Sequence, residues 1–94
     1  MDERIVALAR GLEQGRLSLN PLADGSGVVV DTGPEHLWTM NATAMAIVEA
    51  IAAGAGSVDE IAERLVQRFQ VDTERARGDV GRCLDHLYQA LAAG

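Results

Sequence analysis

The spacing of apolar residues changes near Asn41 from a period of two to the period of a helix. Residues 16–41 contain three short segments whose alternating or β-branched residues predict strands. These segments are RLSLN at 16–20, GVVVD at 27–31 and HLWTM at 36–40, with the turn sequences DGSG and TGPE between them. We therefore expect a three-stranded antiparallel meander.

The helical spacing after Asn41 predicts three helices. The first covers about residues 42–53, with Asn41 and Thr43 as alternative N-caps. A Gly-Ala-Gly sequence at 54–56 ends it. The second helix covers about residues 58–69 and starts with the capping box SVDE.

The third helix starts at the sequence DTER, residues 72–75, and has an apolar side at helical spacing. That side carries Ala76, Val80, Cys83, Leu84, Leu87 and Leu91. Gly78 and Gly81 interrupt the helix, and each costs about 1 kcal/mol relative to alanine. Three strands followed by three helices predict an α+β domain with the helices on one face of the sheet.

The segment before the first strand allows two interpretations. Leu8 and Leu12 belong to an apolar set at helical spacing, which predicts a short amphipathic helix over residues 3–13. Two glycines in the segment weaken this helix, so a partly ordered N-terminal arm is the alternative. In both interpretations residues 1–15 precede a separate domain at 16–94.

Charge and cysteine content narrow the classes of function. The chain has a formal net charge of −6, and all its positive charge comes from arginine. A nucleic-acid-binding protein needs a basic face to neutralise phosphates, so this balance argues against nucleic acid and favours a neutral or basic partner. Cys83 is the only cysteine, and no apolar run suits a signal peptide or a membrane span, which predicts a cytoplasmic protein without a membrane anchor.

The sequence carries no recognisable catalytic, metal or cofactor motif. His36 lies on a predicted strand, and His86 follows Cys83 by three residues on the third helix. One cysteine with one nearby histidine is too few ligands for a structural zinc site. The glycine-rich sequence DGSG lacks the lysine and the following helix of a phosphate-binding loop. We therefore predict a protein that is not an enzyme and holds no metal or cofactor.

A three-stranded sheet has two edges, and each presents an unpaired row of N–H and C=O groups. If HLWTM at 36–40 is one of these edges, it is able to accept a strand from another chain. This predicts a binding protein rather than a catalyst.

Three parts of the chain resemble the PqqD family, whose members are the recognition elements for ribosomally made, post-translationally modified peptides (RiPPs). LWTMNATAMAI at 37–47 is similar to the family signature, in which an aromatic-rich strand leads through Leu-Asn and a Thr-Ala or Thr-Gly pair into an apolar helix. SVDEIAERLVQRFQVD at 57–72 resembles the second helix of the family, and RARGDVGRCLDHLYQAL at 75–91 resembles the third. The resemblance extends over about residues 16–92.

The resemblance implies a winged helix-turn-helix-like domain that binds the leader of a precursor peptide as an added strand, between the third strand and the third helix. It implies a peptide chaperone that presents the leader to a leader peptidase or another modifying enzyme. Within the family, the chain is most similar to the stand-alone leader-binding protein of lasso-peptide biosynthesis. It departs from the pattern at Leu37, where an aromatic residue is usual, and in its extra segment 1–15.

On the strand, the expected peptide-binding residues are His36, Leu37, Trp38, Thr39 and Met40. Alternation places Trp38 and Met40 on one side and Leu37 and Thr39 on the other. Met40 immediately precedes a helix and is expected in the core. Trp38 is either a core residue or a wall of the peptide groove.

On the third helix, the expected peptide-binding residues are Asp79, Arg82, Cys83 and His86, which share a flank beside the apolar side. This flank either faces the peptide or is solvated. Asp79 is suited to a basic leader residue and Arg82 to an acidic one. Arg75 and Arg77 near the helix start are either functional or part of a solvated face, since cations are unfavourable at that end of a helix.

Two other functions fit the predicted fold. A winged-helix DNA-binding regulator has a similar arrangement of elements, although the acidic charge opposes it. In a dimerisation module, the edge strands of two copies would pair with each other. For the peptide-binding interpretation we expect a monomer or a weak dimer.

Overall fold

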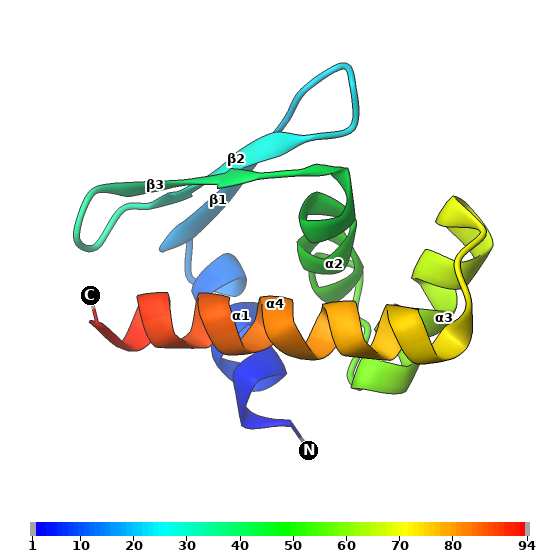
Figure 1. Cartoon of the computed structure of the whole chain (residues 1–94). Helices are drawn as coiled ribbons and strands as arrows, with labels where there is room; N and C mark the ends of the chain where they lie inside the picture. The colour runs from blue at the N-terminus through cyan, green and yellow to red at the C-terminus, as the bar shows by residue number, and fades with distance from the viewer. Residues whose placement is uncertain (1, 94) are drawn as a thin grey trace.

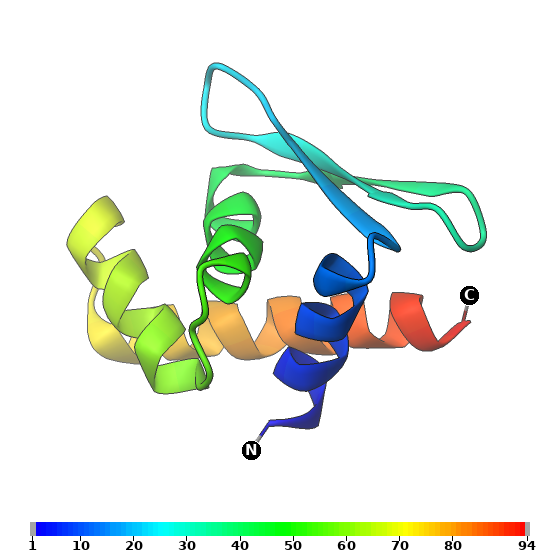
Figure 2. The ribbon, with the colours of Figure 1, turned by 180° about the vertical axis from the view of Figure 1, so that it is seen from behind.

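The sheet forms one layer and the helices form the other, as the sequence predicts for an α+β domain. The computed structural model describes residues 2–93, and Figures 1 and 2 show all four helices on the same side of the sheet. In chain order the elements are α1 (Glu3–Glu13), β1 (Leu17–Pro21), β2 (Gly27–Asp31), β3 (His36–Met40), α2 (Ala42–Ala52), α3 (Val58–Phe69) and α4 (Thr73–Ala93). The predicted fold class is confirmed. Within residues 2–93 no helix is both long enough and apolar enough to cross a membrane.

The sheet is an antiparallel meander in the order β1-β2-β3, so β1 and β3 form its edges. Val29 in the central strand lies opposite Leu19 and Trp38, and it is only 1% exposed because its side chain points to the helices. Alternate residues share a face of a sheet, so Trp38 and Met40 also belong to this inner face. Leu37 points outward and is 69% exposed.

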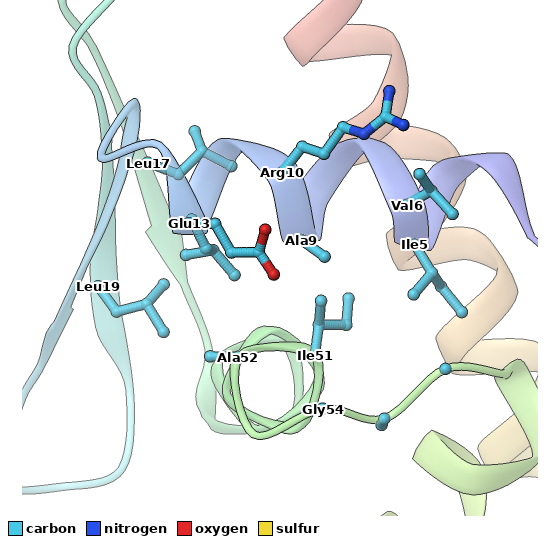
Figure 3. Close-up of a pocket in the computed structure, with 13 residues that line it drawn as sticks. Ile5, Val6, Ala9, Arg10, Glu13, Leu17, Leu19, Ile51, Ala52 and Gly54 are labelled. Atoms are coloured by element: carbon cyan, nitrogen blue, oxygen red, sulfur yellow. The ribbon is translucent and has the colours of Figure 1, made fainter.

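The segment before β1 forms helix α1, which supports the helical interpretation over the partly ordered arm. Ile5 and Leu8 from this helix are buried in the same core as the later elements. A cleft remains between α1 and the C-terminal end of α2 (Figure 3). The predicted division at residue 15 stays a prediction, although α1 packs on the domain that follows it.

Arg4 ties α1 to α4. Its guanidinium donates to the carbonyl oxygen of Gly81 at 3.2 Å and to a carboxylate oxygen of Asp85 at 2.6 Å. The N-cap residue Asp2 accepts from the Arg4 backbone N–H at 2.9 Å and from its guanidinium at 2.7 Å. These bonds favour the ionised carboxylate and lower the pKa of Asp2 to about 2.

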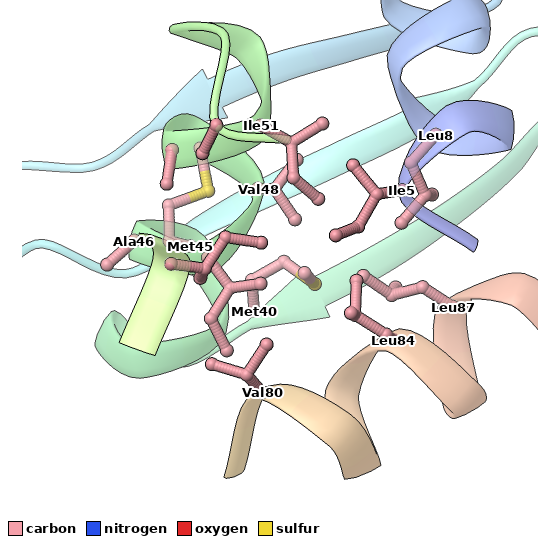
Figure 4. Close-up of a cluster of buried hydrophobic side chains, with 14 of the residues drawn as sticks. Ile5, Leu8, Met40, Met45, Ala46, Val48, Ile51, Val80, Leu84 and Leu87 are labelled. Atoms are coloured by element: carbon pink, nitrogen blue, oxygen red, sulfur yellow. The ribbon is translucent and has the colours of Figure 1, made fainter. Parts of the chain in front are cut away.

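One hydrophobic core joins the sheet to all four helices (Figure 4). Met40 from β3, Met45 from α2 and Leu84 from α4 all lie in it. The predicted core position of Met40 is confirmed, since only 6% of the residue is exposed. The apolar side predicted for the third helix is buried except at Cys83, which is half-buried.

A single residue connects β3 to α2. Asn41 is the N-cap, and its side-chain oxygen accepts from the backbone N–H of Ala44 at 2.8 Å, so Asn41 rather than Thr43 fills the predicted role. The Asn41 cap therefore fixes the end of β3 and the start of α2 to one another.

Ser57 caps α3 in the same way, accepting from the N–H of Glu60 at 3.1 Å.

A partly buried ion pair fastens the sheet to the C-terminal end of α4. Asp31 on β2 is fully buried, and its carboxylate accepts from Arg16 at 3.0 and 3.2 Å. The same guanidinium donates to the carbonyl oxygen of Leu91 at 3.2 Å, and the backbone N–H of Gly33 donates to Asp31 at 3.1 Å. One arginine thus holds the β1–β2 hairpin and α4 together.

Replacing Arg16 by methionine is expected to lower the free energy of unfolding by about 3 kcal/mol, because the Asp31 carboxylate then stays buried without its cation. Urea unfolding followed by circular dichroism measures this loss. The double variant Arg16→Met/Asp31→Leu should regain most of it, since no charge is then buried. Arg10→Met on the exposed face of α1 serves as the control, and an equal loss in that variant would contradict the explanation.

The same substitution should have opposite effects at two glycines. At Gly27 a Cβ would lie 2.7 Å from the Met45 sulfur and 2.8 Å from the Asn20 carbonyl oxygen, so Gly27→Ala should cost about 1–3 kcal/mol of stability. At Gly81 no atom beyond the adjacent backbone of α4 lies within 4 Å of the added Cβ, so Gly81→Ala should stabilise α4 by about 1 kcal/mol. Thermal melting of the two variants checks both signs.

Candidate functional site

The free edge of β3 is defined by the hydrogen bonds of the other strands. The N–H of Leu22 donates to the carbonyl oxygen of Ser26, and the N–H of Thr32 donates to that of Arg16. These bonds extend the β1–β2 ladder at both ends in the same register, so the even-numbered residues of β2 bond to β1. The odd-numbered residues of β2, including Val29, must then bond to β3.

This alternation divides β3 into two sets of backbone groups. Trp38 and Met40 lie opposite Val29 and Gly27, so their N–H and C=O groups bond to β2. Leu37 and Thr39 direct their N–H and C=O groups away from the sheet. Within residues 2–93 no further strand pairs with β3, so these groups are available to an added strand.

The side chains of β3 also fall into two sets, one exposed and one packed toward the core. Leu37 and Thr39 are exposed on the outer face, and His36 is exposed at the start of the strand. Trp38 is half-buried and packs against the hydrophobic core. Met40 offers an added strand neither its side chain, which is in the core, nor its backbone groups, which bond to β2.

A pocket of about 320 Å³ lies where β3 ends, between the first turns of α2 and the N-terminal half of α4. Its lining residues are Asn41, Thr43, Ala44, Ile47, Arg75, Asp79, Arg82 and Cys83. We refer to it as the junction pocket. Three of the residues expected from the sequence, Asp79, Arg82 and Cys83, come together here. The strand residues His36 to Thr39 and the helix residue His86 are not part of its lining.

Asp79 and Arg82 are already paired with each other, since the guanidinium of Arg82 donates to the carboxylate of Asp79. Arg82 is 74% exposed in this pair and Asp79 30% exposed. From the sequence, Asp79 is suited to a basic leader residue and Arg82 to an acidic one, whereas in the structure the two side chains neutralise each other. Cys83 lies beside them, and burial raises the pKa of its thiol to about 11.

His86 is exposed one turn further along α4. Across residues 2–93, no group of three or more His, Cys, Asp or Glu side chains is placed to hold a metal ion. That this flank holds no zinc stays a prediction from the sequence.

Three residues of the site are not evident from the sequence: Asn41, Thr43 and Ala44. The sequence indicates helix capping and the family signature for them, and the structure places all three in the lining of the junction pocket. The available signal was the absence of a loop between strand and helix, because a helix that starts at the strand end must present its first turn there. Arg75 also lines this pocket, whereas Arg77 pairs with Asp59 at 2.9 Å.

A larger cleft of about 700 Å³ lies on the opposite side of the molecule, between α1, β1 and the C-terminal end of α2 (Figure 3). Small residues such as Ala9, Ala52 and Gly54 leave this space between the helices. Its walls are mostly apolar, with Arg10 and Glu13 as the charged side chains. The arrangement is suited to apolar contact and offers no set of catalytic groups.

The edge beside this cleft is less suited to strand addition than β3. On β1 the groups that point away from β2 belong to Leu17, Leu19 and Pro21, by the same alternation. Pro21 has no N–H to donate, and a proline on an edge strand discourages further pairing. The β3 edge keeps all its outward-facing donors, so it is the better candidate for a peptide.

Comparison with known proteins identifies a matching family model. The family model described as Coenzyme PQQ synthesis protein D (PqqD) matches residues 26–90, which contain β2, β3, α2, α3 and most of α4. A search of curated proteins and a search of solved structures found no match. PqqD proteins bind peptide substrates in the biosynthesis of PQQ and other RiPPs, work with a partner enzyme, and are generally non-catalytic chaperones. Because the match covers well over half of the sequence, the chain belongs to the PqqD family.

Proposed function

We propose that this protein binds the leader segment of a precursor peptide as a fourth strand on the free edge of β3. The observation that carries the proposal is the outward direction of the N–H and C=O groups of Leu37 and Thr39. Main-chain bonds to such an edge supply affinity, and neighbouring side-chain pockets supply specificity. The junction pocket lies at the end of this edge and is suited to supplying specificity.

The precursor we propose is that of a lasso peptide, because the sequences around the strand-to-helix junction and the start of α4 resemble the stand-alone leader-binding proteins of that pathway. The protein performs no chemistry in this proposal. It holds the leader in an extended conformation and presents it to a leader peptidase or another modifying enzyme. His36, Leu37, Trp38 and Thr39 on β3, and Asp79, Arg82, Cys83 and His86 on α4, are the proposed peptide contacts.

A proline at position 39 should abolish leader binding without unfolding the protein. Thr39→Pro removes an N–H that faces outward and makes no bond to β2, so the existing sheet keeps its hydrogen bonds. Pro21 occupies an equivalent outward-facing position on the other edge strand. We expect at least a tenfold loss of affinity for a synthetic leader peptide, measured by isothermal titration calorimetry.

The matched control is Thr39→Val, which changes the same side chain and keeps the N–H. It should bind the leader within about threefold of the original protein. Equal binding by Thr39→Pro, with an unchanged circular dichroism spectrum, would exclude strand addition at this edge. Ala9→Leu fills the cleft beside α1 and should leave the affinity for the leader unchanged. A loss of affinity in this variant would indicate that the peptide binds in that cleft instead.

Alkylation of Cys83 should report the occupied pocket. The thiolate is the reactive form, so the rate with iodoacetamide should keep rising with pH towards the pKa of about 11, beyond the range of an ordinary thiol. A bound leader should slow the reaction at pH 9, measured by mass spectrometry. A leader carrying a proline in its docking segment serves as the control and should give no protection. Full reactivity at saturating leader would place the peptide away from the junction pocket.

The two other functions predict different results in the same assays. A DNA-binding regulator would bind random duplex DNA with an affinity that falls steeply as salt increases. A dimerisation module would sediment as a dimer at micromolar concentration and lose that dimer in Thr39→Pro. For the proposed function we expect neither result, and in the absence of leader we expect a monomer or a dimer too weak to persist at micromolar concentration.

A further inference from the structure

We infer that Arg75 selects a leader with an acidic residue at the junction pocket. This inference rests on the proposed function and specifies the chemistry of the peptide that the site accepts. It depends on three features of α4: the charge that remains in the pocket, the position of Arg75 within the helix, and the side of the molecule that the helix shares with β3.

The junction pocket has one cation that the surrounding residues do not neutralise. Its charged lining residues are Arg75, Asp79 and Arg82, and the last two form an ion pair. Among the ion pairs of residues 2–93, none involves Arg75. The pocket is thus locally positive in a protein whose net charge is −6, and it favours a carboxylate over an ammonium group.

Helix capping and the helix dipole do not explain an arginine at position 75. Asp72 caps α4, and its side chain accepts from the backbone N–H of Arg75 at 2.8 Å. Arg75 therefore holds the third position of the helix, where glutamate or glutamine completes a capping box. A cation there also opposes the positive end of the helix dipole. Arg77, by contrast, joins α4 to Asp59 of α3 at 2.9 Å and has a structural explanation.

The pocket is within reach of a strand added to β3. Figures 1 and 2 show β3 and α4 on one side of the molecule, with β1 and α1 on the other. Asn41 directly follows β3 and lines the pocket. A peptide that bonds to Leu37 and Thr39 and continues past the end of β3 therefore meets the start of α4. An acidic side chain at that point of the leader is able to form a bidentate pair with the Arg75 guanidinium.

The test is a charge exchange measured by calorimetry with a synthetic leader peptide. Arg75→Gln should weaken binding by about fivefold, and Arg75→Glu by more than about tenfold. Each acidic residue of the leader is then replaced by lysine, one at a time. One of these peptides should bind the original protein weakly and bind Arg75→Glu within about threefold of the original affinity. A leader that binds tightly and contains no acidic residue would overturn the inference.

Arg64→Glu on α3 is the matched control, because Arg64 is also exposed and also absent from the ion pairs of the described chain. It makes the same change in net charge outside the junction pocket and should leave leader binding unchanged. Equal weakening by Arg64→Glu and Arg75→Glu would show a general effect of charge and overturn the inference. Arg75→Gln and Arg75→Glu should melt at or above the temperature of the original protein, since both residues suit the third helix position.

The two proposals fail in different ways. If the original protein binds no leader, the proposed function is lost, and the role of Arg75 is lost with it. If the original protein binds and Thr39→Pro does not, but neither Arg75 variant changes the affinity, only the role of Arg75 is lost. If one lysine-substituted leader restores the binding affinity of Arg75→Glu, the proposed function and the role of Arg75 are both supported. This result requires a bound peptide and a specific contact at the junction pocket.

Discussion

The connection through Asn41 is the constraint on which the site depends. A strand and a helix normally need a loop between them, but here one residue ends the strand ladder and caps the following helix. Met40 on one side of it is anchored in the core, and Met45 on the other is fully buried. With both neighbours fixed, β3 cannot move away from α2. Its free edge and the first turn of α2 therefore keep one relative position.

Two arginines near the N-terminus hold α4 against the rest of the domain. Arg16 joins the β1–β2 hairpin to the C-terminal end of α4 through the buried Asp31, and Arg4 joins α1 to the middle of α4. Both arginines lie before residue 26, where the PqqD family match begins. The N-terminal part of the chain thus holds the long helix in place from outside the matched region. The position of α4 determines the width of the space beside β3, so these contacts also influence the site.

Most of the fold could be predicted from local patterns. Period-two spacing, turn residues and caps are properties of short segments, and they located all three strands and the three later helices within one or two residues. The sequence of the first helix is compatible with two interpretations, because its two glycines lower the intrinsic stability of the helix. It is helical in the structure, where Ile5 and Leu8 gain burial against the rest of the core. That gain comes from contacts distant in sequence and is not visible in the segment alone.

The sequence by itself determined the α+β class, the strand-to-helix junction, the absence of a recognisable catalytic motif and, through its motifs, the family. Only the tertiary structure decided which groups share a site. Helical spacing placed Asp79 and Arg82 on one flank, but it could not show that they pair with each other and leave Arg75 as the unneutralised cation of the pocket. Alternation identified the faces of β3, whereas the free edge at Leu37 and Thr39 followed from the bonds between the other two strands. The spacing of residues along one helix or strand determines which side chains share a face of that element. Which side chains of neighbouring elements they contact depends on how the sheet and the helices pack together.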